Sequence, residues 1–220
     1  IVGMRSVSKQ TLERLPAYLN YLKSLPEEEA PNISATIIAE ELGLNDVQVR
    51  KDLAMISSGG RPKVGYVTAG LIQDIEQFLG YGTADRAVIV GAGHLGQALL
   101  CYHGFSEYGL EVVAAFDADQ EKCGTRIDGK PVLPMEKLPD LCRRMNIRMG
   151  IITAPAPAAQ EVCDRLIESG IMAVWNFAPV HLKVPKNVLV QNENMAYSLA
   201  VLSKHLIEKM GEPQSTGGCT

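Results

Sequence analysis

The feature that most constrains this 220-residue chain is a glycine-rich turn between an apolar run and a helix-forming run. Ala87 to Val90 are apolar, the motif GxGxxG follows at 91–96, and Gln97 begins a run of helix-forming residues. This order of strand, tight turn and helix predicts the first βαβ unit of a Rossmann-type sheet. A helix that begins at such a turn presents free backbone N–H groups to a phosphate.

A second apolar run, 110–116, ends at Asp117, about 20 residues beyond Gly96. An acidic residue at this distance binds a ribose hydroxyl in dinucleotide-binding folds. Its charge disfavours the 2′-phosphate of NADP(H), and residues 118–120 contain no Arg that could receive one. The pattern predicts NAD(H) as cofactor, and a glycine turn without a ligand is the alternative.

Beyond residue 84 the hydrophobic pattern alternates between short strands and helices. We expect strands at 87–91, 111–116, 148–153 and 171–175, and helices at 94–102, about 135–145 and 156–169. This alternation predicts an α/β fold with a doubly wound parallel sheet, whose ligand lies beyond the carboxyl ends of the strands. Small residues at 153–156 and 176–179 follow two of these strands, where a dinucleotide could approach the backbone. Ordinary proline-containing turns are the alternative there.

The first 80 residues have a mostly helical pattern. We expect an amphipathic helix at 11–25 despite Pro16, an acidic loop at 26–31, a second helix capped by Ser34, and a third from Asp46 to about Ser57, capped by Asn45. The turn at 42–45 fits a helix-turn-helix. A tight hairpin at 58–67, a fourth helix at 68–78 and a linker at 79–83 complete a predicted winged-helix domain.

Basic residues gather on the third predicted helix and the hairpin. Residues 50–63 contain four basic side chains against one acid, Asp52, although the whole chain has a net charge of −4. We expect Val47, Val49, Leu53 and Ile56 to face the core, with Gln48, Arg50, Lys51 and Ala54 nearer solvent. Such a basic surface is typical of a DNA-reading helix and wing. The alternative is a solvated face on a domain that binds protein.

Residues 192–210 form a last predicted helix with an apolar stripe at 195, 199, 202 and 206. Either its own sheet or a second subunit must cover that stripe. The expected domains are therefore 1–80 (winged helix), 84–191 (dinucleotide binding) and 192–220 (terminal helix and polar, disordered tail).

Several classes of protein are disfavoured by what the sequence lacks. No apolar run reaches the ~18 residues of a membrane span and no signal-peptide core is present, so we expect a cytoplasmic protein. Five cysteines without a CxxC pair indicate neither a disulfide framework nor a zinc site. None of the four histidines has a partnered acid at an interpretable spacing, so we expect no catalysis. A small NAD-dependent oxidoreductase, a coenzyme A site on the same fold, and a protein-binding adaptor stay open.

The winged helix, glycine loop and terminal helix, in this order, resemble the Rex family of redox-sensing transcriptional repressors. The most specific matches are Gln48 to Leu53, Val64-Gly65-Tyr66, Val90 to Gly96, Ala115 to Asp117 and Asn176 to Val180. The resemblance covers nearly the whole chain. It implies a homodimer that binds palindromic operator DNA while NADH is low and leaves it when NADH binds, with terminal helices exchanged between subunits.

The resemblance also implies site residues. The cofactor would lie against Gly91, Ala92, Gly93, His94, Leu95 and Gly96 at the pyrophosphate, Asp117 and Ala118 at the adenosine ribose, Thr153, Ala154, Pro155, Asn176 and Ala178 along its path, and Tyr102 and Phe105 toward the nicotinamide. DNA would be contacted by Gln48, Arg50, Lys51, Arg61 and Lys63. No metal ligand or catalytic residue is implied.

Three departures from the family concern its contacts with DNA and the way it switches. A Ser-Tyr-Phe-Gly type of stretch after the recognition helix is replaced by residues 54–57, which read Ala-Met-Ile-Ser. An arginine common on the first helix is Asn20 here, and an aspartate common at the start of the terminal helix is Asn194. In the family this charged pair helps to switch states, so its loss predicts an altered latch.

Overall fold

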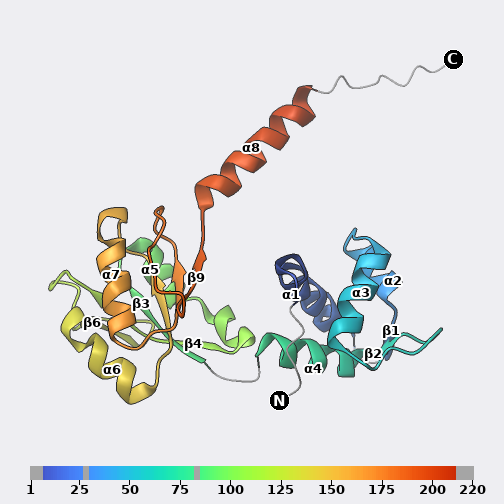
Figure 1. Cartoon of the computed structure of the whole chain (residues 1–220), viewed down its shortest axis with the longest axis horizontal. Helices are drawn as coiled ribbons and strands as arrows, with labels where there is room; N and C mark the ends of the chain where they lie inside the picture. Colours follow the sequence, from blue (N-terminus) through green and yellow to red (C-terminus); the bar gives the residue numbers. More distant parts are fainter. Residues whose placement is uncertain (1–6, 27–29, 82–84, 212–220) are drawn as a thin grey trace. The chain divides into compact units, whose positions relative to one another are not determined.

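The computed structural model describes residues 7–26, 30–81 and 85–211, and it divides into two compact units, 1–83 and 84–220. Figure 1 colours both units along the chain. The expected acidic loop, the linker and the polar tail each lie wholly or partly outside the described residues. Each unit is considered by itself below.

The N-terminal unit packs four helices against each other and against a small antiparallel sheet. Its elements are α1 (Lys9–Ser24), β1 (Asn32–Ile33), α2 (Ala35–Glu41), α3 (Asp46–Ile56), β2 (Tyr66–Val67) and α4 (Thr68–Leu79). The predicted caps are confirmed, because the side chains of Ser34 and Asn45 accept hydrogen bonds from the amides of Ile37 and Gln48. Leu15, Leu19, Ile38, Leu53 and Ile75 form the centre of one core.

The expected single hairpin over 58–67 is only partly correct. A tight turn joins Arg61 to Gly65, but the next two residues, Tyr66 and Val67, pair with β1. Gly65 makes this change of partner possible, since it has φ +85° and a Cβ there would overlap the carbonyl of Ile33. The turn therefore extends from a two-stranded sheet made of β2 and β1, and β1 comes directly before α2.

The expectation that Val47 faces the core is wrong. Val47 is 54% exposed, whereas Val49 and Leu53 are fully buried. Residues two apart on a helix point about 200° apart, so Val47 and Val49 cannot both face the same core. Asp52, which the sequence placed among the surface charges, is itself completely buried.

The C-terminal unit is built on a seven-stranded sheet in the order β5-β6-β4-β3-β7-β8-β9. Every neighbouring pair is parallel except β5 with β6. The strands are β3 (Asp85–Val90), β4 (Leu110–Asp117), β5 (Arg126–Ile127), β6 (Lys130–Pro134), β7 (Met149–Ile152), β8 (Ala173–Asn176) and β9 (Leu189–Asn192). Without β5, this is the strand order of a dinucleotide-binding sheet, which reverses between β3 and β7.

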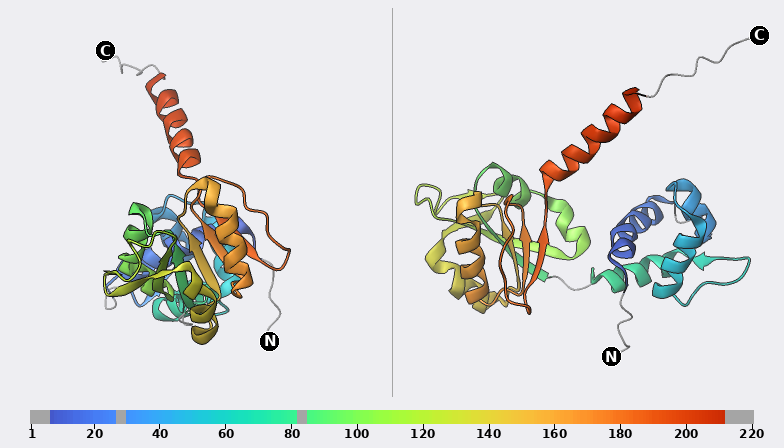
Figure 2. Two further views of the ribbon diagram at one scale, coloured as in Figure 1. Left: turned by 90° about the vertical axis from the view of Figure 1, so that its left-hand side faces the viewer. Right: turned by 45° about the horizontal axis from the view of Figure 1, so that its top comes forward.

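Helices cover both faces of this sheet, as Figures 1 and 2 show. They are α5 (His94–Leu100), η1 (His103–Tyr108), η2 (Met135–Lys137), α6 (Leu138–Met145) and α7 (Ala156–Glu168). Val88 and Val90 pack with α6 and α7, whereas Ala87 and Ile89 pack with α5 and η1. This alternation along β3 is the two-residue period of a strand that is buried on both sides.

The terminal helix α8 (Met195–Gly211) follows β9 directly. The described residues leave its predicted stripe uncovered: Leu199, Leu202 and Leu206 are 64%, 66% and 56% exposed. Of the two coverings expected from the sequence, its own sheet does not bury this stripe.

Candidate functional site

The three glycines of the loop after β3 have different surroundings. Gly91 has φ +110°, and a Cβ there would lie 2.8 Å from the carbonyl carbon of Thr153. A Cβ on Gly96 would overlap the carbonyl oxygen of Gly91. Gly93 has an ordinary φ of −78°, and a Cβ there would meet nothing within 4 Å. The fold thus requires Gly91 and Gly96, whereas Gly93 borders open space at the N-terminus of α5, where a pyrophosphate would fit.

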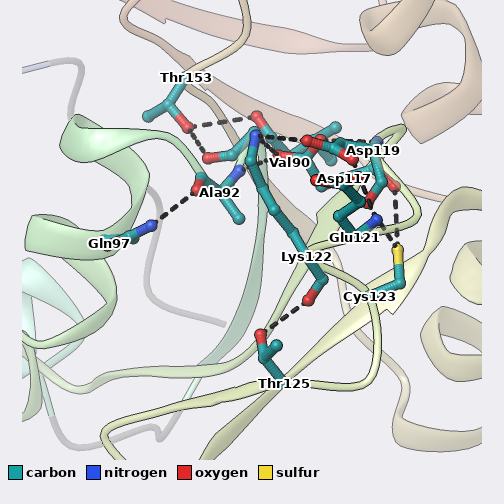
Figure 3. A network of polar contacts seen from close by, with 11 residues as sticks. Val90, Ala92, Gln97, Asp117, Asp119, Glu121, Lys122, Cys123, Thr125 and Thr153 are labelled. Atoms are coloured by element: carbon teal, nitrogen blue, oxygen red, sulfur yellow. Dashed lines mark hydrogen bonds and ion pairs between the residues drawn. The ribbon is translucent and has the colours of Figure 1, made fainter.

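Thr153, at the end of β7, holds the glycine loop in place (Figure 3). Its hydroxyl donates to the carbonyl oxygen of Gly91 at 2.7 Å, and its amide donates to that of Val90 at 2.9 Å. Gln97 donates from its side chain to the carbonyl of Ala92 at 3.0 Å. The Thr153 hydroxyl is therefore used to position the loop.

Asp117 ends β4 beside the same loop, and its carboxylate is held by backbone and side-chain donors (Figure 3). The amide of Ala92 donates to Oδ2 at 2.7 Å and the amide of Asp119 to Oδ1 at 2.9 Å. Burial alone would raise the pKa of Asp117, but these two bonds and the ammonium of Lys122 outweigh it and lower the pKa. The carboxylate is thus ionised and fixed in direction, as an acceptor for ribose hydroxyls must be.

Lys122 is a residue that the sequence reasoning missed. Its Nζ lies 3.2 Å from Asp117 Oδ2 and 3.6 Å from Asp119 Oδ2. The signal available in the sequence was a lysine five positions after Asp117, two positions beyond residues 118–120, which lack an arginine. With two carboxylates against one ammonium, the site remains net negative, which still disfavours a 2′-phosphate.

Asn176, predicted along the cofactor path, is completely buried. Its amide nitrogen donates to the carbonyls of Ala178 and Val180 and to Asn192 Oδ1, and its Oδ1 accepts from the Ala178 amide. These bonds use the side chain to shape the turn after β8. Any contact of Asn176 with a cofactor would therefore come from its backbone.

The predicted aromatic pair belongs to a longer row. Tyr102 and Phe105 meet edge to face with ring centroids 4.9 Å apart, and Phe105 lies 5.8 Å from Trp175. Trp175 in turn lies 4.9 Å from Phe177. The sequence reasoning missed Trp175 and Phe177, because their residue types at the end of a strand look like ordinary core residues.

Of the residues predicted to contact DNA, two on α3 have partners inside the helix. Arg50 pairs with Asp46 at 2.8 Å and Gln48 donates to Asp52 at 3.0 Å. Lys51, Arg61 and Lys63 are exposed, and no ion pair joins any of them to another residue in the described parts of the chain. The outward surface of α3 and the 61–65 turn thus presents uncompensated positive charge, which suits phosphates.

A buried network that the sequence reasoning missed fixes α3 to α1. The Asp52 carboxylate accepts from Thr11 at 3.1 Å, from Arg14 at 2.8 Å and from the Tyr18 hydroxyl at 2.9 Å. Burial would raise the pKa of Asp52, but these bonds and that from Gln48 lower it. The same burial and contact with Asp52 raise the pKa of Tyr18 to about 12.

Other kinds of site find no support in the parts of the chain that the structure describes. They contain no cluster of His, Cys, Asp or Glu that could hold a metal ion. No helix in them is both long and apolar enough to cross a bilayer. The cysteines at 101, 123, 142 and 163 are free thiols.

A Rossmann-type sheet with this glycine loop, on the same chain as a helix-turn-helix unit, defines a class: DNA-binding regulators that respond to a nucleotide. Comparisons with known proteins agree. The family model described as "CoA binding domain" matches residues 83–180, and the model described as "Putative DNA-binding protein N-terminus" matches residues 6–54.

Relatives match over most of the chain. The redox-sensing transcriptional repressor Rex of Treponema denticola is 41% identical over 192 residues, covering 87% of this chain and 91% of the relative. That of Porphyromonas gingivalis is 40% identical over 196 residues, covering 89% and 90%. The crystal structure of the protein RSP in complex with β-NAD+ and operator DNA matches with a TM-score of 0.88 at 33% identity, covering 94% of this chain and 95% of that one. This chain belongs to the Rex family of redox-sensing transcriptional repressors.

Proposed function

We propose that this protein is an NAD(H)-responsive repressor that binds operator DNA as a homodimer and is released by NADH. The observation that carries the proposal is the similarity of both units at once to RSP, whose structures contain β-NAD+ together with operator DNA in one case and β-NADH in another. A similarity confined to the sheet would support nucleotide binding alone.

The described residues of the C-terminal unit fit NAD(H). The open space at Gly93 and the N-terminus of α5 would take the pyrophosphate, with Ala92, His94 and Leu95 beside it. Asp117 and Ala118 would bind the adenosine ribose. Residues 153–155, 176 and 178 would border the remaining path toward Tyr102 and Phe105. When bound, the nicotinamide would supply the redox state to be sensed.

The N-terminal unit would bind DNA through α3 and the 61–65 turn. Lys51, Arg61 and Lys63 are free to meet phosphates, whereas Arg50 and Gln48 would exchange their present carboxylate partners for DNA groups. The uncovered stripe of α8 would be buried against a second subunit, by exchange between the two copies. In this proposal residues 1–80 bind DNA, residues 84–191 bind NAD(H), and residues 192–220 contain the helix that forms the dimer. Because its partner is operator DNA, we place the protein in the cytoplasm.

We further propose that the protein works without turnover. Its relatives are named as repressors. In the part of the chain that the structure describes, no ion pair joins His94, the histidine of the glycine loop, to an acid. His103 lies 3.5 Å from Asp128, but its side chain is 80% exposed, unlike a proton donor enclosed with its substrate. The oxidoreductase and the adaptor without DNA binding are therefore less well supported.

The test is a fluorescence-anisotropy titration of the full chain against duplexes that it selects from fragmented genomic DNA. NADH should weaken binding to the selected duplex by roughly 5-fold to 150-fold, NAD+ by much less, and coenzyme A not at all. Lys63→Ala should weaken all duplexes about equally and reduce the salt slope by about one unit.

Three results would contradict the proposal. Absence of salt-dependent binding to any duplex at low ionic strength favours the adaptor. Steady oxidation of NADH by a carbonyl substrate favours the oxidoreductase. Release from DNA by coenzyme A alone favours a coenzyme A site.

A further inference from the structure

The start of α8 is fastened to β8 by three hydrogen bonds. The Trp175 indole N–H donates to Glu193 Oε1 at 2.9 Å, and the amide of Glu193 donates to the carbonyl of Asn176 at 2.8 Å. The Asn176 side chain donates to Asn192 Oδ1 at 2.9 Å. Asn194 then caps α8, since its Oδ1 accepts from the Tyr197 amide at 2.9 Å. The direction in which α8 leaves the sheet is thus set immediately before the helix begins.

Trp175 is also a member of the aromatic row, between Phe105 and Phe177. Its ring contacts Phe105 on one side and Phe177 on the other, and Phe105 contacts Tyr102, which is 53% exposed. A continuous chain of side chains therefore leads from the exposed Tyr102 to the carboxylate of Glu193. Aromatic rings in edge-to-face contact move together more readily than separately, because displacement of one opens a void beside the next.

This row lies on the side of the sheet where the second half of a dinucleotide would extend. Asp117 on β4 marks the adenosine half, and the glycine loop after β3 marks the pyrophosphate. A dinucleotide crosses the sheet at the point where the strand order reverses, which is between β3 and β7. Its other half therefore extends toward the ends of β7 and β8, and Trp175 is the penultimate residue of β8.

We propose that Trp175 and Glu193 are positioning residues that connect the nicotinamide end of the dinucleotide site to the start of α8. This inference rests on the proposed function and names how its two sites are coupled. Occupation of the nicotinamide end would displace Tyr102 and Phe105, and Trp175 would pass the displacement to Glu193 and so to α8. Glu193 comes directly before Asn194, the cap of α8, so a change at its carboxylate acts at the start of that helix.

The indole bond suits such a connection because it is directional and charge-assisted. A carboxylate that accepts an N–H bond forms a shorter and stronger contact than a neutral acceptor does. Asn194 has no charge, so the neighbouring Glu193 is the acidic group at this end of α8. A displacement of the ring that exceeds the normal range of N–H···O distances must either break this bond or turn the segment 192–194.

The test compares four variants of the full chain with wild type: Trp175→Phe, Glu193→Ala, their combination, and Glu193→Gln. The control is Gln191→Ala, an exposed side chain on β9. For each we would measure NADH affinity, affinity for the selected duplex, and the factor by which NADH weakens duplex binding. Trp175→Phe keeps an aromatic ring but removes the N–H donor, and Glu193→Gln keeps an acceptor oxygen.

Trp175→Phe and Glu193→Ala should each reduce, by about 5-fold or more, the factor by which NADH weakens duplex binding. The affinity for NADH without DNA and the affinity for the duplex without NADH should each change less than about 3-fold. The combination should reduce the factor no further, since both changes break one bond. Glu193→Gln should retain most of the factor, and Gln191→Ala all of it. A residue that only stabilised the fold would lower both affinities and leave their coupling unchanged.

Trp175 also provides a spectroscopic measurement, because it is the one tryptophan of the sequence. Its emission should be quenched by added NADH, which absorbs where tryptophan emits, and the emission maximum should shift in Glu193→Ala. Wild-type factors in both single variants, or effects that sum in the combination, would overturn the inference. A wild-type protein whose DNA binding ignores NADH would overturn the proposed function instead, and the inference with it.

Discussion

Gly93 directly precedes α5 and Gly96 lies in its first turn, but of these two glycines only Gly96 is required by the fold. A Cβ at Gly96 would overlap the Gly91 carbonyl and approach the Thr153 hydroxyl, whereas a Cβ at Gly93 meets open space. Gly96→Ala should therefore lower the free energy of unfolding by about 1–3 kcal/mol, as overpacking does. Gly93→Ala should unfold at the wild-type temperature and yet lose about tenfold or more in NADH affinity.

Thermal melts and calorimetry on the two variants measure both effects. Undiminished NADH affinity in Gly93→Ala would mean that the pyrophosphate does not lie against this loop. Loss of stability in the same variant would mean that the open space is needed by the fold, and the comparison would then say nothing for a ligand.

At the scale of single residues, the sequence predicts those groups that are recognised by their spacing along the chain. The glycine loop and Asp117 were predictable because their distance along the chain is fixed by one βαβ unit. Lys122 was not, because its contact with Asp117 depends on how the turn after β4 folds back. Nor was the burial of Asn176, whose partners include Asn192 on the neighbouring strand β9.

At the scale of elements, α3 is positioned by a charge that it buries. Asp52 is on the inner side of α3, and its bonds to Thr11, Arg14 and Tyr18 fix the helix against α1. Such a carboxylate, if neutralised, leaves Arg14 without its partner. The sequence shows Asp52 only as an acid among basic residues, so its structural role could not be predicted from the pattern.

Asp52→Asn should destabilise the N-terminal unit by about 3 kcal/mol at neutral pH, near the low end for breaking a buried pair, because Arg14 keeps some access to water. Since the pKa of Asp52 is lowered on folding, its contribution is present above the unfolded pKa of about 3.9 and is lost as pH falls below it. The gap between wild type and Asp52→Asn should therefore shrink below about pH 4.

Hydrogen exchange of the α1 and α3 amides measures this gap, since the one tryptophan lies in the other unit. Asp46→Asn is the matched control, because the exposed Asp46–Arg50 pair should contribute less than about 1 kcal/mol. Equal destabilisation by the two variants, or a gap independent of pH, would contradict the assigned role of Asp52.

Some strands and helices could be predicted from the hydrophobic pattern of the sequence, and others could not. The central strands β3, β4, β7 and β8 and the helices α5, α6 and α7 are apolar or amphipathic runs, and all were predicted within a few residues. The 3-10 helix η1 was not predicted. Nor were strands β5, β6 and β9. β5 has two residues, β6 carries Pro131 and Pro134, and the exposed pattern of β9 resembles a loop. These strands form because an existing sheet edge offers them partners.

For the whole molecule, the question is how two compact units influence each other. Coupling between NADH and operator DNA is a free-energy difference, so it must be reciprocal. If NADH weakens operator binding by a given factor, operator DNA must weaken NADH binding by the same factor. Calorimetry of NADH with and without the duplex supplies the second number, and unequal factors would mean that the two ligands do not act on one equilibrium.

The exposed apolar stripe of α8 makes this helix the surface that we expect a second subunit to cover. Truncation after Gln191 should abolish dimerisation and operator binding and leave the glycine loop intact, as measured by sedimentation and by NADH calorimetry. A truncated chain that remains dimeric would place the subunit contact elsewhere.

The last prediction concerns Asn20 on α1 and Asn194, which directly precedes α8. The resemblance to the Rex family implies opposite charges at these two positions. Because both residues are uncharged, we expect electrostatic attraction to contribute less to switching in this protein, and side-chain packing to contribute more. Asn20→Arg combined with Asn194→Asp should change the NADH response by more than the two single changes together, because only the combination introduces opposite charges at the two positions. The measurement is operator affinity with and without NADH in all four combinations. Strict additivity would show that these positions do not act as a coupled switch here.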